Sequence, residues 1–180
     1  LDGLMAKAAN HAAIHLKYLN QKKGPAVRAT RAQADRSIYR SHMRRLIDET
    51  KQLFVFQAGI DDLILDQSTV IGVITDTGYR FLSRQVILTT GTFLKGKIHI
   101  GEKQLTAGRA GDPAATTLGQ ALRKMPLRFG RLKTGTPARI AASTVDFSGM
   151  EIQPSDNPRP IFSYLGKLSE QPEQRNCFIT

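Results

Sequence analysis

Small hydroxyl residues and a glycine follow an apolar run near the middle of the sequence. Val86-Ile87-Leu88 leads directly into Thr89-Thr90-Gly91-Thr92. In an α/β sheet, ligands bind beyond the carboxyl ends of the strands, and a glycine there lets a bound group approach the backbone. The pattern therefore predicts a strand that ends in a ligand-binding turn. A tight turn that only ends a buried strand explains the same residues equally well.

A second candidate binding segment is the loop GRAGDP, residues 108–113. It precedes a helix expected over Ala115–Lys124, which Pro126 ends. The first N–H groups of a helix and its dipole favour anions. Arg109 is therefore well placed to contact a phosphate or an anionic ring.

Two further segments are rich in cations. The first, GPAVRATRAQADR (24–36), lies beside an expected helix start, and the second, LRFGRLKTGTPARI (127–140), surrounds another T-G-T turn. Both suit a phosphate-bearing partner. A solvated basic face is the alternative for the first segment, and a basic hairpin edge is the alternative for the second. The candidate cations are Arg28, Arg31, Arg36, Arg128, Arg131, Lys133 and Arg139.

The cysteine and histidine content argues against a metal site. The single cysteine, Cys177, excludes an internal disulfide and a multi-cysteine zinc site. Among the four histidines, only His11 and His15 have a spacing that would place them on one helical face, and no acidic residue accompanies them. We expect no metal site, and we expect Cys177 to be a small buried side chain rather than a nucleophile.

The overall charge favours a polyanionic partner. The 180 residues contain 26 Lys and Arg against 15 Asp and Glu, a net charge of +11. Nucleic acid is the commonest partner of so basic a chain. The sequence has neither an apolar run of transmembrane length nor a segment shaped like a signal peptide, so we expect a cytoplasmic protein that does not bind a membrane.

The expected elements are those of an α/β fold. Helical periodicity covers 4–12 and about 32–50, and alternation predicts strands at 14–19 and 53–60. Three short apolar runs between Leu63 and Phe81 predict an antiparallel meander before the strand at Val86. This order is similar to the second half of a glutathione-reductase-type, Rossmann-like FAD-binding domain, although unrelated α+β domains also show it.

Four motifs together resemble one family. GPAVRATRAQADR, LTTGTFLKGKIHIG (88–101), GRAGDP and RLKTGTPAR (131–139) occur in the order and spacing of the MnmG (GidA) family. These enzymes install the carboxymethylaminomethyl modification at C5 of the tRNA wobble uridine. The resemblance covers almost the whole chain. It implies FAD as cofactor, NADH as its reductant and a folate as one-carbon donor. It also implies tRNA as substrate, an MnmE-family GTPase as partner and a homodimeric full-length protein.

The resemblance also nominates cofactor-binding residues. It implies a main-chain contact from Ile60, at the end of its strand, to the adenine end of FAD. Thr90, Gly91 and Thr92 would lie along the cofactor, and the 108–115 loop would approach the flavin. The family often has serine at position 115, so Ala115 offers only its backbone. The nominated residues are Ile60, Thr90, Gly91, Thr92, Arg109 and Ala115.

No G-x-G-x-x-G fingerprint occurs in this chain, although such FAD domains open with one. We therefore expect an internal piece of a larger enzyme, inactive alone, whose catalytic residues lie outside it. Residues 1–138 would be part of the FAD domain, and 139–180 part of an insertion domain with loops and short strands. The alternatives are a non-catalytic basic RNA-binding domain and a relative of the folate- and FAD-dependent tRNA methyltransferases.

Overall fold

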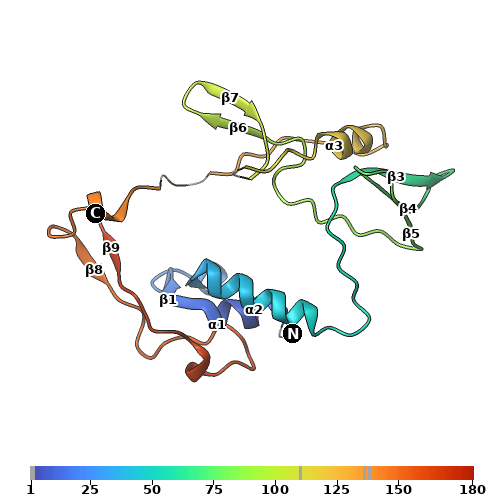
Figure 1. Ribbon diagram of the computed structural model, residues 1–180. Helices are drawn as coiled ribbons and strands as arrows, with labels where there is room; N and C mark the ends of the chain where they lie inside the picture. Colours follow the sequence, from blue (N-terminus) through green and yellow to red (C-terminus); the bar gives the residue numbers. More distant parts are fainter. Residues whose placement is uncertain (1–2, 110, 136, 138) are drawn as a thin grey trace. The chain divides into compact units, whose positions relative to one another are not determined.

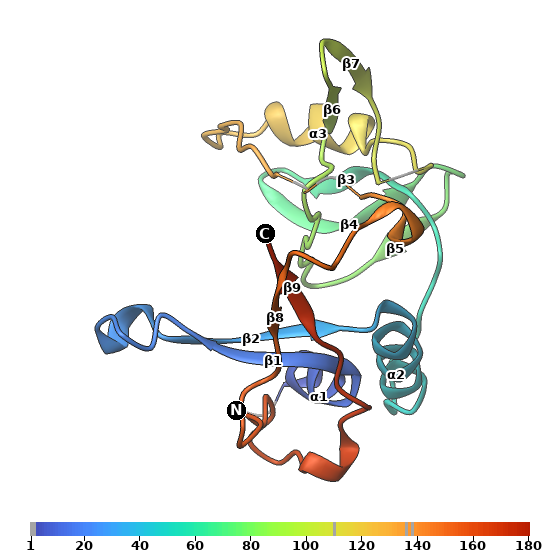
Figure 2. The same ribbon diagram turned by 90° about the vertical axis from the view of Figure 1, so that its left-hand side faces the viewer.

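The computed structural model describes residues 3–109, 111–135, 137 and 139–180. Its packing divides the chain into two compact units, which are Leu1–Phe54 with Arg139–Thr180, and Val55–Ala138. Figures 1 and 2 together label the α-helices and strands of both units. The first unit contains α1 (Leu4–Ala12), β1 (Ala13–Leu19), β2 (Ala29–Ala34), α2 (Arg36–Asp48), β8 (Glu151–Gln153), β9 (Cys177–Ile179) and three 3-10 helices (Pro25–Val27, Ala142–Thr144 and Leu168–Glu170).

Small and apolar side chains build the core of the first unit. Ala8 and Ala12 of α1 and Leu16 of β1 are fully buried. β1 and β2 pair as an antiparallel ribbon with Leu16 opposite Ala32. The helices α1 and α2 pack against each other and lie side by side in Figures 1 and 2. The alanines allow this close approach because they present little side-chain volume.

The 139–180 segment packs along the free edge of β1. The Asp156 amide donates to the Leu16 carbonyl at 2.9 Å, and the Arg175 amide donates to the Ile14 carbonyl at 2.6 Å. The antiparallel pair of strands β8 and β9 crosses the β1–β2 ribbon in Figure 2. Strand β1 is therefore bonded on both edges, by residues close to it in sequence and by residues of the distant 139–180 segment.

The second unit begins with a three-stranded antiparallel sheet in the order β3-β4-β5. Its strands are β3 (Ile60–Asp66), β4 (Thr69–Thr75) and β5 (Arg80–Leu82). The turn between β4 and β5 contains Gly78 at φ +84°, a left-handed conformation that suits glycine. The Thr75 amide donates to the Tyr79 carbonyl at 2.9 Å and closes this turn.

A hairpin and a helix complete the second unit. The hairpin consists of β6 (Lys97–Ile100) and β7 (Lys103–Thr106), and the helix is α3 (Thr116–Arg123). Helix α3 packs against β3, and Leu118, Leu122 and Ile64 form its buried core. In Figures 1 and 2 the hairpin projects away from α3. The sheet and the helix therefore support the loops that connect β5 to β6 and β7 to α3.

Local periodicity predicted most of these elements. The expected helices at 4–12 and 115–124, the strand at 14–19 and the antiparallel meander are confirmed. Residues 139–180 form loops and short strands, as expected.

The prediction of one helix over 32–50 is wrong at its start. Residues Ala29–Ala34 form β2, and the helix α2 begins at Arg36. Asp35 sets this boundary, because its carboxylate accepts hydrogen bonds from the Ser37 amide at 2.8 Å and the Ile38 amide at 3.0 Å. Pairing with β1 overrides the helical preference of the alanines before it.

Two predicted strands are absent from the described residues. The segments 53–59 and 86–88 run as irregular chain, and β3 begins only at Ile60. Phe54 is 93% exposed and Ile87 is 86% exposed. A strand requires a ladder partner for its N–H and C=O groups, and these two segments have none within the part of the chain that the structure describes.

The domain division at 138/139 stays a prediction. Packing joins residues 139–180 to residues 1–54, through the bonds to β1. Within the described ranges, no helix has the length and the apolar character needed to cross a membrane.

Candidate functional site

The two predicted cofactor loops meet at the start of α3. Leu94 forms a parallel bridge with Ala115. The Lys95 amide donates to the Ala115 carbonyl at 2.9 Å, and the Ala115 amide donates to the Phe93 carbonyl at 3.3 Å. These backbone bonds dock the segment after Thr90-Gly91-Thr92 against the N-terminus of the helix. We name residues 90–96, 108–109 and 111–116 together the loop junction.

Glycines allow the backbones to approach closely at the loop junction. A Cβ on Gly96 would lie 2.8 Å from the Ala107 carbonyl oxygen. A Cβ on Gly108 would collide with the Pro113 carbonyl oxygen, and one on Gly119 would lie 3.0 Å from Lys95 Cβ. These glycines are therefore needed for packing. Gly91 differs from them, because a Cβ there would meet open space.

The turn at Thr90-Gly91-Thr92 is open to solvent. All three residues are exposed, and Gly91 adopts φ +62°. The turn offers two threonine hydroxyls and a backbone that no Cβ covers at Gly91. This donor and acceptor set suits a ligand that carries phosphate, hydroxyl or ring carbonyl groups.

The start of α3 supplies further donors. Ala115 occupies the N-cap position, and its methyl group accepts no hydrogen bond. The Thr116 amide is occupied, since it donates to the Ala114 carbonyl at 2.8 Å. The later amides of the first turn have no N-cap side chain to donate to, and the helix dipole makes this end attractive to anions.

Arg109 lies in the tight loop beside this helix start. The Gly108 amide donates to the Asp112 carbonyl at 2.9 Å, and the Asp112 amide donates to the Arg109 carbonyl at 2.6 Å. The Arg109 residue itself is exposed. Its neighbour Ala110, part of the predicted 108–115 binding loop, lies outside the described residues.

Ile60 belongs to the same unit but to a different element. The expectation that it ends a strand is wrong, because the residues before it have no ladder partner among the described residues and Ile60 opens β3. It is half-buried and pairs with Thr75 of β4. The Asp76 amide donates to the Gly59 carbonyl at 3.0 Å and fixes the chain just before it. Ile60 is therefore placed by the meander, whereas the other five predicted cofactor residues belong to the loop junction.

Four of the predicted tRNA-binding cations belong to the first unit, and two of them already donate hydrogen bonds. Arg31 is half-buried on β2, and its guanidinium donates to Gln153 Oε1 at 3.1 Å. Arg28 is exposed and donates to the Lys23 carbonyl at 3.3 Å. Arg36 and Arg139 are exposed. Arg31 thus links β2 to the 139–180 segment, which favours a structural contribution.

The other three cations, Arg128, Arg131 and Lys133, are exposed in the second unit. Arg131 donates to the Lys95 carbonyl at 3.2 Å. The second basic segment is therefore tied to the loop junction itself. Thr136 of its T-G-T turn lies outside the described residues.

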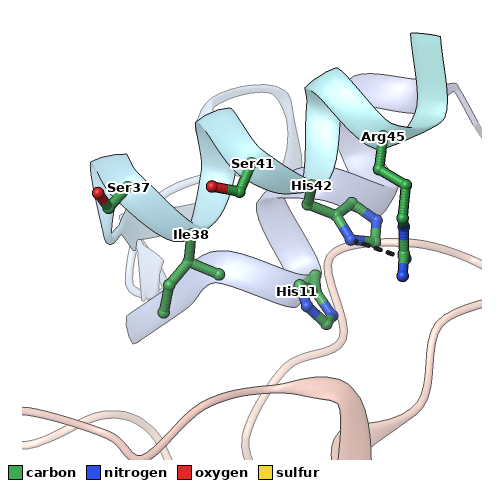
Figure 3. Close-up of a pocket in the computed structure, with 6 residues that line it drawn as sticks. All are labelled: His11, Ser37, Ile38, Ser41, His42 and Arg45. Atoms are coloured by element: carbon green, nitrogen blue, oxygen red, sulfur yellow. Dashed lines mark hydrogen bonds between the residues drawn. The ribbon is translucent and has the colours of Figure 1, made fainter. Parts of the chain in front are cut away.

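A hollow that no sequence pattern predicted lies between α1 and α2. It measures about 400 Å³ and is lined by His11, Ser37, Ile38, Ser41, His42 and Arg45 (Figure 3). The rings of His11 and His42 stack with centroids 4.2 Å apart. No periodicity signals this pair, because the two histidines lie on different helices and meet only through helix packing.

His11 and His15 do not lie on one helical face, although their spacing would allow it. Helix α1 ends at Ala12, so His15 lies in β1, where it is buried with Nε2 3.1 Å from the Gln153 carbonyl oxygen. Among the described residues, no group of three His, Cys, Asp or Glu side chains is arranged to hold a metal. Cys177 is half-buried, and its thiol donates to Gln33 Oε1 at 2.7 Å.

Comparison with known proteins gives a consistent result. The family model described as "Glucose inhibited division protein A" (GIDA) matches residues 1–180. The structure of GidA from Aquifex aeolicus in its form I crystal superposes with a TM-score of 0.88 at 38% identity, and covers 99% of this chain. The form II crystal gives 0.87 at 38% identity and covers 98% of this chain. The GidA-related protein from Thermus thermophilus shares only the fold, at 21% identity and a TM-score of 0.51, over 72% of this chain and 57% of its own.

The chain spans about a third of the length of Aquifex GidA, namely 31% of the form I chain and 30% of the form II chain. The match extends over both units and over all four motifs. It confirms the expected α/β fragment of a glutathione-reductase-type FAD-binding domain with an antiparallel meander. The resemblance of the four motifs to the MnmG (GidA) family is also confirmed, and this chain belongs to the GidA family.

Proposed function

We propose that this chain is part of the FAD-binding region of a flavoenzyme that modifies tRNA. The observation that carries the proposal is the loop junction, in a chain of the GidA family. The junction gathers an open glycine turn and a helix start without a side-chain cap. Both features suit an anionic, multiply hydrogen-bonding ligand such as FAD.

The residues present fit this cofactor. Gly91 leaves open space at its Cα, so a ligand atom can approach the backbone directly. The Thr90 and Thr92 side chains would bond its polar groups, and the first turn of α3 would stabilise negative charge. Ile60 would contribute a main-chain contact from the start of β3. When bound, FAD would supply two-electron redox chemistry to the full-length enzyme.

Two further residues would shape this contact. Arg109 would add a positive charge beside the cofactor from its exposed position in the 108–112 loop. Ala115 would hold the cofactor only through backbone groups, because its methyl group forms no hydrogen bond.

We propose tRNA as the substrate, through the basic segments. Arg128, Arg131 and Lys133 are exposed close in sequence to one another, and Arg131 is bonded to the loop junction. Cations beside a cofactor loop would hold RNA phosphates near the reacting group. Arg28, Arg36 and Arg139 of the first unit would make phosphate contacts of their own, and Arg31 would support β2.

The full reaction that we propose is the carboxymethylaminomethyl modification at C5 of the tRNA wobble uridine. It would take place in the cytoplasm, with an MnmE-family GTPase as partner, NADH as reductant and a folate as one-carbon donor. The full-length protein would be a homodimer. Family membership supports these proposals, while the groups that perform the chemistry are expected outside this chain.

A pair of glycine variants in the full-length protein tests the cofactor site. Gly91 and Gly78 both have positive φ, at +62° and +84°, and both would place a Cβ in open space. Valine therefore imposes similar backbone strain at either position. We expect Gly91→Val to lose most of the bound flavin, measured by absorbance after gel filtration, and Gly78→Val to retain it.

Equal flavin retention by the two variants would contradict the proposed site. A full-length protein that binds tRNA but never flavin would instead support the basic RNA-binding domain.

A further inference from the structure

The hollow between α1 and α2 gathers cationic and hydroxyl groups that the proposed cofactor site does not use. His11 extends from the last turn of α1, and Ser41, His42 and Arg45 extend from the facing side of α2 (Figure 3). Ser37 and Ile38 complete its lining. The lining thus contains one permanent cation, two titratable imidazoles and two hydroxyl groups, and it contains no carboxylate.

Arg45 and His42 interact in a way that depends on protonation. The Arg45 Nη2 lies 3.3 Å from His42 Nδ1. A guanidinium only donates hydrogen bonds, so this contact requires His42 Nδ1 to accept and the imidazole to be neutral. Protonation of His42 would convert Nδ1 into a donor, break this contact and turn both groups toward another acceptor.

The surroundings of His42 oppose its protonation. Partial burial lowers the pKa of His42 below its ordinary value, and the positive charges of His11 and Arg45 lower that pKa further. Glu170 beside α1 and Glu49 at the end of α2 act in the opposite direction, but less strongly. Lys7 lies one helical turn before His11 on α1. An anion in the hollow would remove the repulsion between the three cationic groups.

The N-terminus of α2 is not the source of this anion preference. Asp35 already accepts from the Ser37 and Ile38 amides, so that helix start is occupied. The neighbouring hollow on the outer face of α2 contains Asp48 and Glu49, and Arg44 is bonded there to both oxygens of Asp48 at 2.9 and 2.8 Å. Arg45 and the two serines line both hollows, and Arg45 Nε lies 3.9 Å from Glu49 Oε1. The lining of the hollow on the α1 side itself includes no carboxylate.

We propose that the hollow formed by His11, Ser41, His42 and Arg45 binds a phosphate group, as free phosphate or as a phosphodiester of RNA. The two stacked imidazoles and the guanidinium donate to the anion, and the serine hydroxyls complete its shell. Binding strengthens as the pH falls through the pKa of His42, because the anion favours the protonated form of His42. The proposal is independent of flavin binding.

Carbethoxylation by diethyl pyrocarbonate tests the site in the full-length protein, since the reagent attacks neutral, accessible imidazoles. The rates at His11, His42 and the exposed His99 of β6 are read by mass spectrometry, with and without sulfate, at equal ionic strength. Sulfate keeps its double charge over the pH range of histidine. At about ten times its dissociation constant we expect about tenfold slower reaction at His11 and His42, and no change at His99.

Matched arginine variants assign the protection to the hollow. Arg45→Gln is expected to weaken sulfate binding about tenfold, because a charge-assisted hydrogen bond is lost. Arg44→Gln removes the same charge one residue away and is expected to retain full protection. His42→Gln is expected to abolish the increase of affinity toward acid. Flavin absorbance is expected to be the same in all three variants.

Two probes distinguish the sources of the phosphate group. If inorganic phosphate protects His42 and an RNA oligonucleotide without terminal phosphates does not, the ligand is free phosphate. Protection by that RNA identifies a phosphodiester. Any one of three results would overturn the proposal. The first is equal protection of His99 and His42, and the second is an equal loss of protection in Arg44→Gln and Arg45→Gln. The third is no protection by sulfate, inorganic phosphate or the RNA.

Discussion

Ala115 begins α3 without a side-chain acceptor for the amides of the first turn. A serine there would place its hydroxyl within reach of the Leu118 amide, the usual contact of an N-cap side chain. We expect Ala115→Ser to raise the free energy of unfolding by about 1 kcal/mol, measured by chemical denaturation. We also expect slower release of flavin from the full-length protein, because a serine hydroxyl would add a hydrogen bond to the cofactor that we propose at this position.

Ala114→Ser is the control for this prediction, since residue 114 precedes the N-cap. It is expected to change neither the stability nor the rate of flavin release. Identical behaviour of the two variants would show that position 115 has no special contact with the helix start or the cofactor.

The attachment of β1 to the 139–180 segment has a pH-dependent component. The Tyr18 amide donates to the Asp156 carboxylate at 2.7 Å, and Lys17 Nζ lies 2.9 Å from the same group. These two contacts lower the pKa of Asp156 below its ordinary value of 3.8. A lowered folded-state pKa contributes stability that is present above the ordinary pKa and is lost as the pH falls through the folded-state value.

We therefore expect Asp156→Asn to reduce the free energy of unfolding at neutral pH. On acidification, this free energy is expected to fall less in the variant than in the unchanged protein. Denaturant titrations between about pH 6 and about pH 3 measure both effects. Asp48→Asn, on an exposed helical ion pair with Arg44, is the control and is expected to change stability little. Parallel acid profiles of Asp156→Asn and the unchanged protein would refute the assigned contribution of Asp156.

Local sequence determined the elements that depend on neighbouring residues. Helix α1 follows from its small apolar periodicity, and the meander follows from alternating runs with a glycine in the β4–β5 turn. The loop junction was predicted as two separate loops, but their docking through Leu94 and Ala115 is a tertiary contact. The sequence showed where the glycines were, and only the structure showed which ones are needed for packing.

The elements that were missed depend on distant partners. Strand β2 forms because β1 pairs with it, although its alanines at positions 29, 32 and 34 favour a helix. The runs at 53–56 and 86–88 have the side chains of strands but no pairing partner among the described residues. The contact of His11 with His42 arises from the packing of α1 on α2, which no local pattern encodes.

At the scale of the whole molecule, the net charge of +11 predicts salt-dependent binding of tRNA. Each phosphate contact contributes about 0.7 to 0.9 to the slope of log affinity against log salt concentration. We expect Arg128→Gln combined with Lys133→Gln to lower that slope by about 1.5 in the full-length protein, measured by filter binding. Both side chains are exposed beside the segment that Arg131 ties to the loop junction.

Arg44→Gln is the control for charge alone, because Arg44 is already paired with Asp48 on α2. It is expected to leave the slope almost unchanged. If the slope decreased equally in Arg44→Gln and in the double variant, net charge rather than contacts near the loop junction would determine the affinity.

The absorption spectrum of the purified full-length protein tests the central claim most directly. The chain covers 31% of the Aquifex GidA chain, so the complete protein is the right object for this measurement. We predict stoichiometric FAD that remains bound through gel filtration and is lost in Gly91→Val but not in Gly78→Val. A full-length protein that neither carries flavin nor takes it up when FAD is added would contradict the account.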